Sequence, residues 1–478
     1  IKEKNLKTQE KEVEIPLILV NGEEFGDEKN IPISTGIPLP EGVLFEPENL
    51  KLFENDKEIP VQTSIRSKWS KKGSIKWLGI DFFANYAQGV SLNYLIKLGK
   101  KSSAFIDNPI KLNEDEEKIE LENGILQIKI SKKQFHLFEE IRVDKNKNKI
   151  YEESEIFIKS DKLDGPYWIN AQGKIYRMCL DENPKFTIEE KGPLKVSIRV
   201  DGWAVSEDGE KAGKFITRII VYSGQAEVQV NNTFIVTWDT LQREMRIRDL
   251  GIKTSYVNIG NNLKTIPHEW WKDGFEIPED SSIFLLADRW NSFYIKESKE
   301  EKVLQSFFGT FTYSESLYGK NYFNWFGVMG ENIGIGISQR HLFQLFPKEI
   351  EITKNSIIWH AWPYHSTENI KSGLDIGDYV NLRWLHQGKL LDFQIPEEYF
   401  EAMKTFKKLT PDRKWRWGGD YNCKGYGTGV AITGELLYIF DINSKYKGQF
   451  SMYMQRRSKI FEKYPHAISV PEWTRKTE

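Results

Sequence analysis

Apolar and polar residues alternate in short runs from Glu14 to about Lys100. Ile15–Val20 and Ile75–Phe82 are examples, and Gly, Pro, Asn and Asp residues separate the runs. Alternation with a period of two is typical of β-strands that bury one face. We therefore predict a small β-barrel or sandwich over residues 1–104.

Longer alternating runs follow a mostly polar stretch, Phe105–Glu117, which is the best candidate for a linker. They include Leu194–Val200, Phe215–Tyr222 and Ala226–Val236. These runs exceed the usual strand length of about 5–6 residues, which favours broad stacked sheets over a compact barrel. We predict a large antiparallel β-sandwich over residues 105–395.

After Pro396 the apolar residues take on the spacing of a helix. We predict helices over Glu397–Leu409, Val430–Phe440 and Phe450–Tyr464. Strands followed by helices indicate separate domains. The 478 residues of the chain also exceed the size at which one apolar core usually stops growing, about 250–300 residues. Residues 396–478 are therefore predicted to form a helical segment.

Charge and hydropathy exclude two classes of partner. The chain carries 67 Lys and Arg against 69 Asp and Glu, and the lysines are interleaved with glutamates. No basic stripe is present to hold a nucleic-acid backbone. No apolar run approaches the ~20 residues of a membrane span. We expect neither partner. The sequence starts at Ile1, which is compatible with processing, and we expect a secreted or periplasmic protein.

Aromatic residues are abundant, with 15 Trp, 20 Tyr and 28 Phe. Some of them cluster, as in Trp270-Trp271 and in Trp359–Tyr364. An aromatic ring offers a flat apolar face to a pyranose, and its polar edge can donate a hydrogen bond. The pattern indicates carbohydrate binding, although aromatic rings also fill the cores of large sandwiches.

Three groups of motifs together suggest a known enzyme family. The first comprises Gly36–Gly42, Ile59–Gln62 and Trp69–Leu78, the second Arg218–Gln225 and Leu382–Gly388, and the third Gly425–Gly429 and Thr433–Leu436. In this order of motifs the chain resembles the exo-rhamnogalacturonan lyase family, polysaccharide lyase family 26, and related ulvan-type lyases. The resemblance implies a RIFT-type barrel, a central β-sandwich and the opening of an α/α toroid. It also implies many more toroid helices than residues 396–478 provide, so we expect the helical part to be truncated.

The resemblance implies cleavage of a sugar chain beside a uronic acid by β-elimination. Such an enzyme removes the proton at C5 and expels the oxygen at C4, and a cation must neutralise the adjacent carboxylate. Arg does this well through two parallel hydrogen bonds. Tyr and His suit the roles of base and acid because their pKa values can be shifted toward neutrality. The expected partner is therefore an acidic polysaccharide or oligosaccharide.

Residues of these types concentrate between positions 359 and 426. We predict Arg383 and Arg416 as carboxylate clamps, Tyr421 as a catalytic residue, and His365 as a base or carboxylate neutraliser. A structural role for His365 and a buried ion pair between Arg383 and Asp392 are the alternatives. The predicted substrate-binding residues are His360, Trp362, Tyr364, His386, Trp417, Asn422, Lys424 and Tyr426.

Two other functions remain open. A glycoside hydrolase would use a pair of carboxylates, for which Asp420 and Glu435 are the candidates. A non-catalytic carbohydrate-binding protein would need only the aromatic clusters. The two cysteines lack the spacing of a metal site. Asp375 and Asp378 could bind Ca²⁺, but a turn is the preferred interpretation, and no cofactor is expected.

Overall fold

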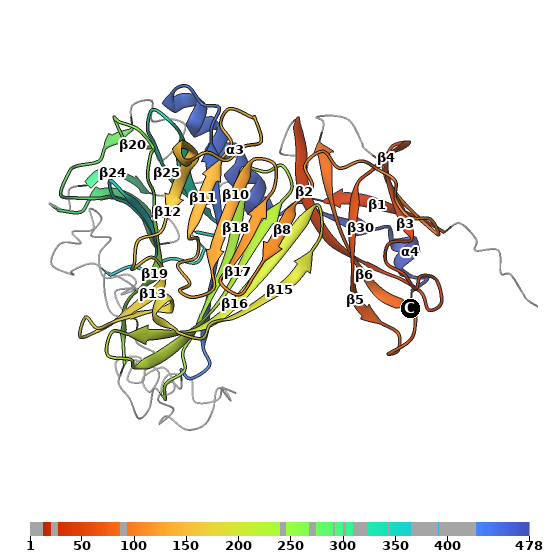
Figure 1. Ribbon diagram of the computed structural model, residues 1–478, viewed down its shortest axis with the longest axis horizontal. Coiled ribbons are helices and arrows are strands. Elements are labelled where there is room, and N and C mark those ends of the chain that lie inside the picture. Colours follow the sequence, from red (N-terminus) through yellow and green to blue (C-terminus); the bar gives the residue numbers. More distant parts are fainter. Residues whose placement is uncertain are drawn as a thin grey trace, which may run out of the picture.

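The fold is built mainly of antiparallel strands, as Figure 1 shows. None of the helices in the described part of the chain has the length and apolar content that a membrane crossing requires. The computed structural model describes residues 13–20, 27–86, 93–239, 245–266, 274–289, 292–299, 303–308, 324–342, 344–364, 391 and 427–477.

The N-terminal strands form two sheets that share one apolar core. Ile33, Leu52 and Ile80 are fully buried members of that core. One sheet has the order β30 (His466–Ser469), β1 (Glu14–Val20), β7 (Tyr94–Leu98), β3 (Leu50–Glu54), β4 (Lys57–Ile59). The other has the order β2 (Glu28–Pro38), β6 (Ile75–Tyr86), β5 (Val61–Lys68). The predicted strands are present, but the pairing gives two sheets and does not establish the RIFT-type barrel that the resemblance implied.

Residues near the C-terminus complete this N-terminal unit. β30 pairs with β1, and Ser469 lies opposite Leu17. Ala467 and Trp473 belong to the N-terminal core, and the Trp473 indole N–H donates to the Pro38 carbonyl oxygen at 2.8 Å. Figure 1 shows β30 and the short helix α4 (Pro471–Thr474) among the N-terminal strands.

The central residues form one large sheet with two arms that meet at β16. The first arm has the order β15 (Lys185–Lys191), β16 (Lys195–Ser206), β17 (Lys211–Tyr222), β18 (Glu227–Ile235), β29 (Ala431–Asp441), β26 (Gly334–Gln339), β25 (Trp325–Met329), β20 (Lys264–Ile266), β21 (Phe275–Glu276). The second arm continues from β16 in the order β14 (Ile175–Arg177), β13 (Gly165–Asn170), β19 (Ile247–Ser255), β28 (Ser356–Trp362), β27 (Lys348–Ile352), β22 (Ile283–Arg289), β23 (Ser292–Glu297), β24 (Val303–Phe308).

A separate five-stranded sheet packs on this large sheet. Its order is β12 (Ile156–Lys159), β11 (Glu140–Val143), β10 (Leu126–Ser131), β9 (Lys118–Glu122), β8 (Lys111–Glu114). Ile128 and Ile141 of this sheet share one core with Ile198 and Ile219 of β16 and β17. In Figure 1, β8, β10 and β11 lie over β16, β17 and β18. These residues therefore form the β-sandwich that the sequence predicts. Two short 3-10 helices, η1 (Glu153–Glu155) and η2 (Met178–Leu180), lie in its connections.

The two arms of the large sheet contact each other through the core. The Trp359 indole N–H of β28 donates to Gln339 Oε1 of β26 at 2.6 Å. A Cβ added at Gly434 of β29 would lie 2.2 Å from the Trp359 ring, so only glycine fits there. Thr254 Oγ1 of β19 and Tyr438 Oη of β29 are hydrogen-bonded at 3.0 Å. The arms thus enclose a layer of large side chains between β19 and β28 on one side and β26 and β29 on the other.

One helix prediction is wrong and another is confirmed. Val430–Phe440, predicted as a helix, is for the most part β29, which is hydrogen-bonded to both β18 and β26. A strand with apolar neighbours on both faces reads as a continuous apolar run, which periodicity alone does not distinguish from a helix. The helix predicted over Phe450–Tyr464 is α3 (Lys447–Lys463). Glu397–Leu409 lies outside the described residues.

The described residues 427–477 do not form a toroid of helices. They supply β29 to the central sheet, α3 against β25, β26 and β29, and β30 to the N-terminal sheet. The prediction of a helical segment over 396–478 therefore does not hold for this part of the chain. Its one long helix is amphipathic and buries Phe450 and Met454 against the sheet beside Trp325.

Candidate functional site

The structure describes three of the predicted site residues, His360, Trp362 and Tyr364. They lie at the end of β28 and just beyond it. The others lie outside the described residues, as do Asp375, Asp378 and Asp420: His365, Arg383, His386, Arg416, Trp417, Tyr421, Asn422, Lys424 and Tyr426.

His360 is surrounded by carboxylates. Its Nδ1 lies 2.9 Å from Asp249 Oδ1, and its Nε2 lies 3.1 Å from Glu351 Oε2 and 3.6 Å from Glu349 Oε1. Only 8% of the imidazole side chain is exposed. A fifth residue, Tyr167, has its hydroxyl 3.1 Å from Asp249 Oδ2 and 3.4 Å from His360 Nδ1. We call these five residues the carboxylate–histidine cluster.

Strand register explains how distant residues meet in this cluster. In β28, Trp359 points into the core, so the next residue, His360, points to the opposite face of the sheet. His360 is paired with Gly251 of β19 and with Glu349 of β27. Glu349 and Glu351 are two residues apart in β27 and therefore share that face.

Gly251 makes room at the centre of this arrangement. A Cβ at that position would lie 2.3 Å from the Trp359 carbonyl oxygen and 3.2 Å from the Tyr167 hydroxyl oxygen. The register of β19 against β28 shifts between Leu250 and Gly251. This bulge is the kind of irregularity that re-aims side chains beside functional sites. Tyr167 enters from β13, where it is paired with the same glycine.

The apolar residues of β22 border the carboxylates. Phe284 is opposite Glu351, and Leu286 is opposite Glu349. Both apolar side chains are buried. Ser282 donates a hydrogen bond from its hydroxyl to Glu351 Oε1. Because an apolar border lowers the local dielectric constant, charges in the cluster interact more strongly than they would in water.

The net effect of burial and neighbouring charges raises the pKa values of two residues in the cluster. Burial alone would lower the pKa of His360, but the carboxylates of Asp249, Glu351 and Glu349 outweigh it and hold that pKa well above its usual range. Burial, together with the Asp249 and Glu351 carboxylates, raises the pKa of Tyr167 well above its usual range. Both shifts favour the protonated forms, which are the imidazolium of His360 and the neutral hydroxyl of Tyr167.

Trp362 and Tyr364 differ in their surroundings. Trp362 is paired with Leu250 and packs against the core. Tyr364 is 37% exposed, and the Arg248 guanidinium lies 4.6 Å from the centroid of its ring. Arg248 is itself exposed and immediately precedes Asp249 of the cluster. We call Arg248 and Tyr364 the guanidinium–tyrosine pair.

One described residue beyond Tyr364 also contacts β19 near this pair. The continuous described stretch ends at Tyr364, and Leu391 then forms two backbone hydrogen bonds with Ile247, of 2.8 and 3.1 Å. Farther along, the Gly429 N–H donates to the Val236 carbonyl oxygen at 2.8 Å. Leu391 thus lies beside Ile247, the residue that precedes Arg248 in β19.

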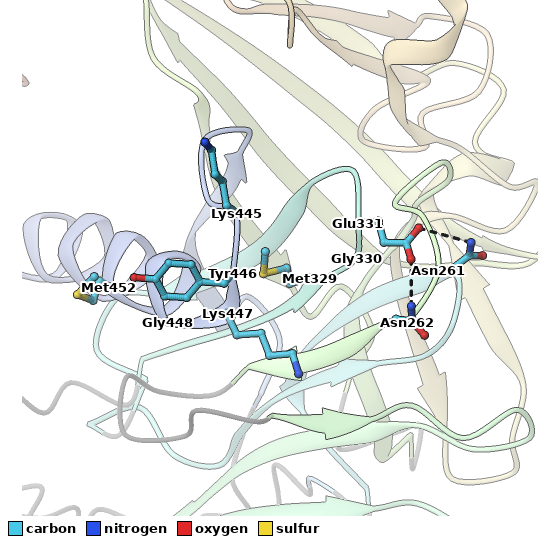
Figure 2. A pocket seen from close by; sticks show the side chains of 10 residues that line it. All are labelled: Asn261, Asn262, Met329, Gly330, Glu331, Lys445, Tyr446, Lys447, Gly448 and Met452. Carbon is cyan, nitrogen blue, oxygen red and sulfur yellow. Dashed lines mark hydrogen bonds between the residues drawn. The ribbon is translucent and has the colours of Figure 1, made fainter.

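A concavity lies elsewhere on the central sheet. It has a volume of about 850 Å³, and Figure 2 shows Glu331 hydrogen-bonded to Asn261 and Asn262 on one side and Tyr446 and Met452 on the other. It sits at the β25–β26 turn, at the opposite end of β26 from Gln339. The predicted site residues that the structure describes are not part of it.

Glu435, which was a candidate catalytic carboxylate for a glycoside hydrolase, is engaged in an ion pair with an arginine. It lies in β29 and forms an ion pair with Arg340. The Arg340 guanidinium also packs over the rings of Phe461 and Tyr464. Glu435 therefore links the central sheet to α3, and the described residues do not bring it to the carboxylate–histidine cluster.

Residues 110–262 match the family model for the PcRGLX-like protein central beta sandwich domain. No curated protein matches the chain. Among solved structures, the chain is similar to a protein in the glycosyl hydrolase family 38 from Enterococcus faecalis, with 13% identity, a TM-score of 0.46, and coverage of 96% of this chain and 47% of that one. The chain is also similar to an alpha-mannosidase from Enterococcus faecalis V583, with 12% identity, a TM-score of 0.45, and coverage of 96% of this chain and 46% of that one.

A galactose mutarotase related enzyme from Lactobacillus acidophilus is also similar, with 11% identity, a TM-score of 0.30, and coverage of 69% of this chain and 98% of that one. The chain spans about half the length of the two Enterococcus proteins. The family match extends from β8 to β19 and includes Tyr167 and Asp249 of the cluster. Residues 110–262 are thus similar to the central β-sandwich of PcRGLX-like proteins, which supports the resemblance to rhamnogalacturonan lyases at the level of that sandwich.

Proposed function

We propose that the protein is a polysaccharide lyase that cleaves a uronic-acid-containing polymer, of the rhamnogalacturonan type, by β-elimination. The guanidinium–tyrosine pair is the observation that carries the proposal. It offers an exposed aromatic ring and a fixed positive charge at one place, 4.6 Å apart. These are the two groups that bind the apolar face and the carboxylate of a sugar acid. The match of residues 110–262 to the PcRGLX-like sandwich supports the same assignment.

Charge decides where the sugar acid binds. The carboxylate–histidine cluster contains three acidic side chains, and like charges repel in a partly buried site. The substrate carboxylate is therefore expected on the Arg248 side of Tyr364. Arg383 and Arg416 are proposed as further clamps, and Tyr421 and His365 as the groups that move protons at C5 and at the leaving oxygen.

Activity on a panel of acidic polysaccharides tests the proposal. The full chain is incubated with rhamnogalacturonan, polygalacturonate and ulvan, and ultraviolet absorbance is followed. A lyase leaves a C4–C5 double bond conjugated with the carboxylate, which absorbs, and the proposal predicts this signal on at least one polymer. New reducing ends without absorbance would identify a hydrolase. Binding without any cleavage would identify a carbohydrate-binding protein.

A further inference from the structure

We propose that the carboxylate–histidine cluster binds a divalent transition metal ion, with His360 Nε2 and one carboxylate oxygen each of Glu349 and Glu351 as ligands. The three potential ligand atoms lie within 4.8 Å of one another. They come from two adjacent strands, β27 and β28, so the register of a sheet fixes their separation. The inference does not depend on the lyase activity proposed above, because metal content is measured on the protein itself.

The separations of the ligand atoms fit a tetrahedral ion. Ligands at Zn–N and Zn–O distances of 2.0–2.2 Å lie about 3.4 Å from each other at a tetrahedral centre. His360 Nε2 is 3.1 Å from Glu351 Oε2 and 3.6 Å from Glu349 Oε1. Both distances lie within about 0.3 Å of that value, and the Glu349 and Glu351 oxygens, within 4.8 Å of each other, close on the ion by a side-chain movement of about 1 Å or less.

Asp249 orients the histidine as metal sites require. A metal-binding imidazole almost always donates its other ring N–H to a carboxylate or carbonyl group, which fixes the tautomer. His360 Nδ1 is 2.9 Å from Asp249 Oδ1, and the Tyr167 hydroxyl donates to Oδ2 of the same carboxylate at 3.1 Å. With Nδ1–H directed at Asp249, the Nε2 lone pair points toward Glu349 and Glu351.

The ligand set selects the class of ion. An imidazole nitrogen with two carboxylates suits Zn²⁺ and neighbouring first-row ions, whereas Ca²⁺ takes six to eight oxygen ligands. When the ion binds, His360 Nε2 releases one proton to solvent. The ion then occupies the position of that proton, between Nε2 and the two glutamate carboxylates. The Glu351 side chain is 23% exposed and that of Glu349 is 4% exposed, so access to the ion is from the Glu351 side.

Zinc binding by tag-free full-length protein tests the inference. The protein is stripped with a chelator, titrated with Zn²⁺ by calorimetry, and assayed for retained zinc by mass spectrometry after desalting. One zinc per chain is expected. Glu351→Gln keeps the shape of a partly exposed side chain and is expected to weaken Zn²⁺ binding at least tenfold. His360→Ala is expected to remove it.

Two further variants keep the test decisive if His360→Ala fails to fold. Asp249→Asn leaves all three ligands in place and is expected to weaken Zn²⁺ binding by about 10–100-fold. His341→Ala is the matched control. His341 is a half-exposed histidine that is not part of the cluster, and its Nδ1 lies 2.9 Å from Glu462 Oε1. This variant is expected to bind zinc like the wild type. Absence of zinc in the wild type, or equal binding by wild type and Glu351→Gln, would overturn the inference.

Discussion

Trp359 and His360 are consecutive residues of β28 whose side chains face opposite sides of the sheet. The Trp359 indole donates to Gln339 in the core, while the His360 imidazole contacts Asp249 and Glu351. The strand therefore connects the carboxylate–histidine cluster directly to the main core of the large sheet. A change in core packing at Trp359 is expected to disturb the cluster as well as stability.

Gly434→Ala tests this packing. The added methyl group would lie 2.2 Å from the Trp359 ring, and overpacking of this kind costs about 1–3 kcal/mol. We expect a clear fall in the thermal unfolding temperature, which is measured by calorimetry or by dye fluorescence. Gly36→Ala is the control, because Gly36 also lies in a strand and the nearest atom to a Cβ at that position would be 3.4 Å away, in the Trp77 ring. An equal fall in both variants would contradict the packing argument.

Lys195→Met tests the contact between the N-terminal unit and the central sheet. Lys195 Nζ lies 3.1 Å from Asp81 and 2.9 Å from Glu190, and all three side chains are largely buried. Removing one member of a buried ion pair leaves an uncompensated charge and costs about 3–5 kcal/mol. We expect the unfolding temperature to fall strongly. Lys111→Met, at an exposed pair with Glu122, should change it little. Similar effects of the two substitutions would refute this account.

Arg248→Ala and Tyr364→Ala test the sugar contact. A hydrogen bond to a charged group contributes about 1.5–3 kcal/mol, so loss of Arg248 should lower kcat/KM on the cleaved polymer roughly 10- to 150-fold. Lys76→Ala is the control, because Lys76 also lies 4.6 Å from an aromatic ring, that of Trp69, in the N-terminal unit. If Lys76→Ala and Arg248→Ala lose the same activity, the guanidinium–tyrosine pair has no special role.

Cys179 gives a prediction about pH. Burial raises the pKa of its thiol to about 11, so at pH 8 the folded protein holds it as an unreactive thiol. In a Cys423→Ser background, we expect slow alkylation at pH 8 and fast alkylation after denaturation. Between about pH 9 and 11 the folded state binds more protons at this thiol than the unfolded state does. The contribution of Cys179 to the free energy of unfolding therefore falls as the pH rises through this range. Fast alkylation of the folded protein at pH 8 would show that the thiol is accessible.

Many of the β-strands could be predicted because the alternation of apolar and polar residues is visible within a single short segment of sequence. Ile75–Phe82 and Phe215–Tyr222 were predicted from it and lie in β6 and β17. β29 was missed because a strand buried between neighbours has a continuous apolar sequence, Leu436 to Phe440, which also suits a buried helix. The alternation belongs to single strands, whereas the order of strands in a sheet depends on contacts far apart in sequence.

The carboxylate–histidine cluster was only partly predictable for the same reason. The concentration of His, Arg and Tyr residues between positions 359 and 426 points to His360, and the alternation of Lys348–Ile352 places Glu349 and Glu351 on one face. Nothing local connects these residues with Tyr167 and Asp249. Their meeting depends on the pairing of β13, β19, β28 and β27, which are contributed by separate parts of the chain.

The pairing of Ser469 with Leu17 has a consequence for synthesis in the cell. A ribosome makes β1 before the central sheet, and β30, the strand that pairs with the other edge of β1, emerges only after that sheet. Until then β1 is an open sheet edge, which is a template for pairing with other chains. Nascent chains stalled before His466 are therefore expected to be prone to aggregation, and chaperone dependence should be greatest at that stage.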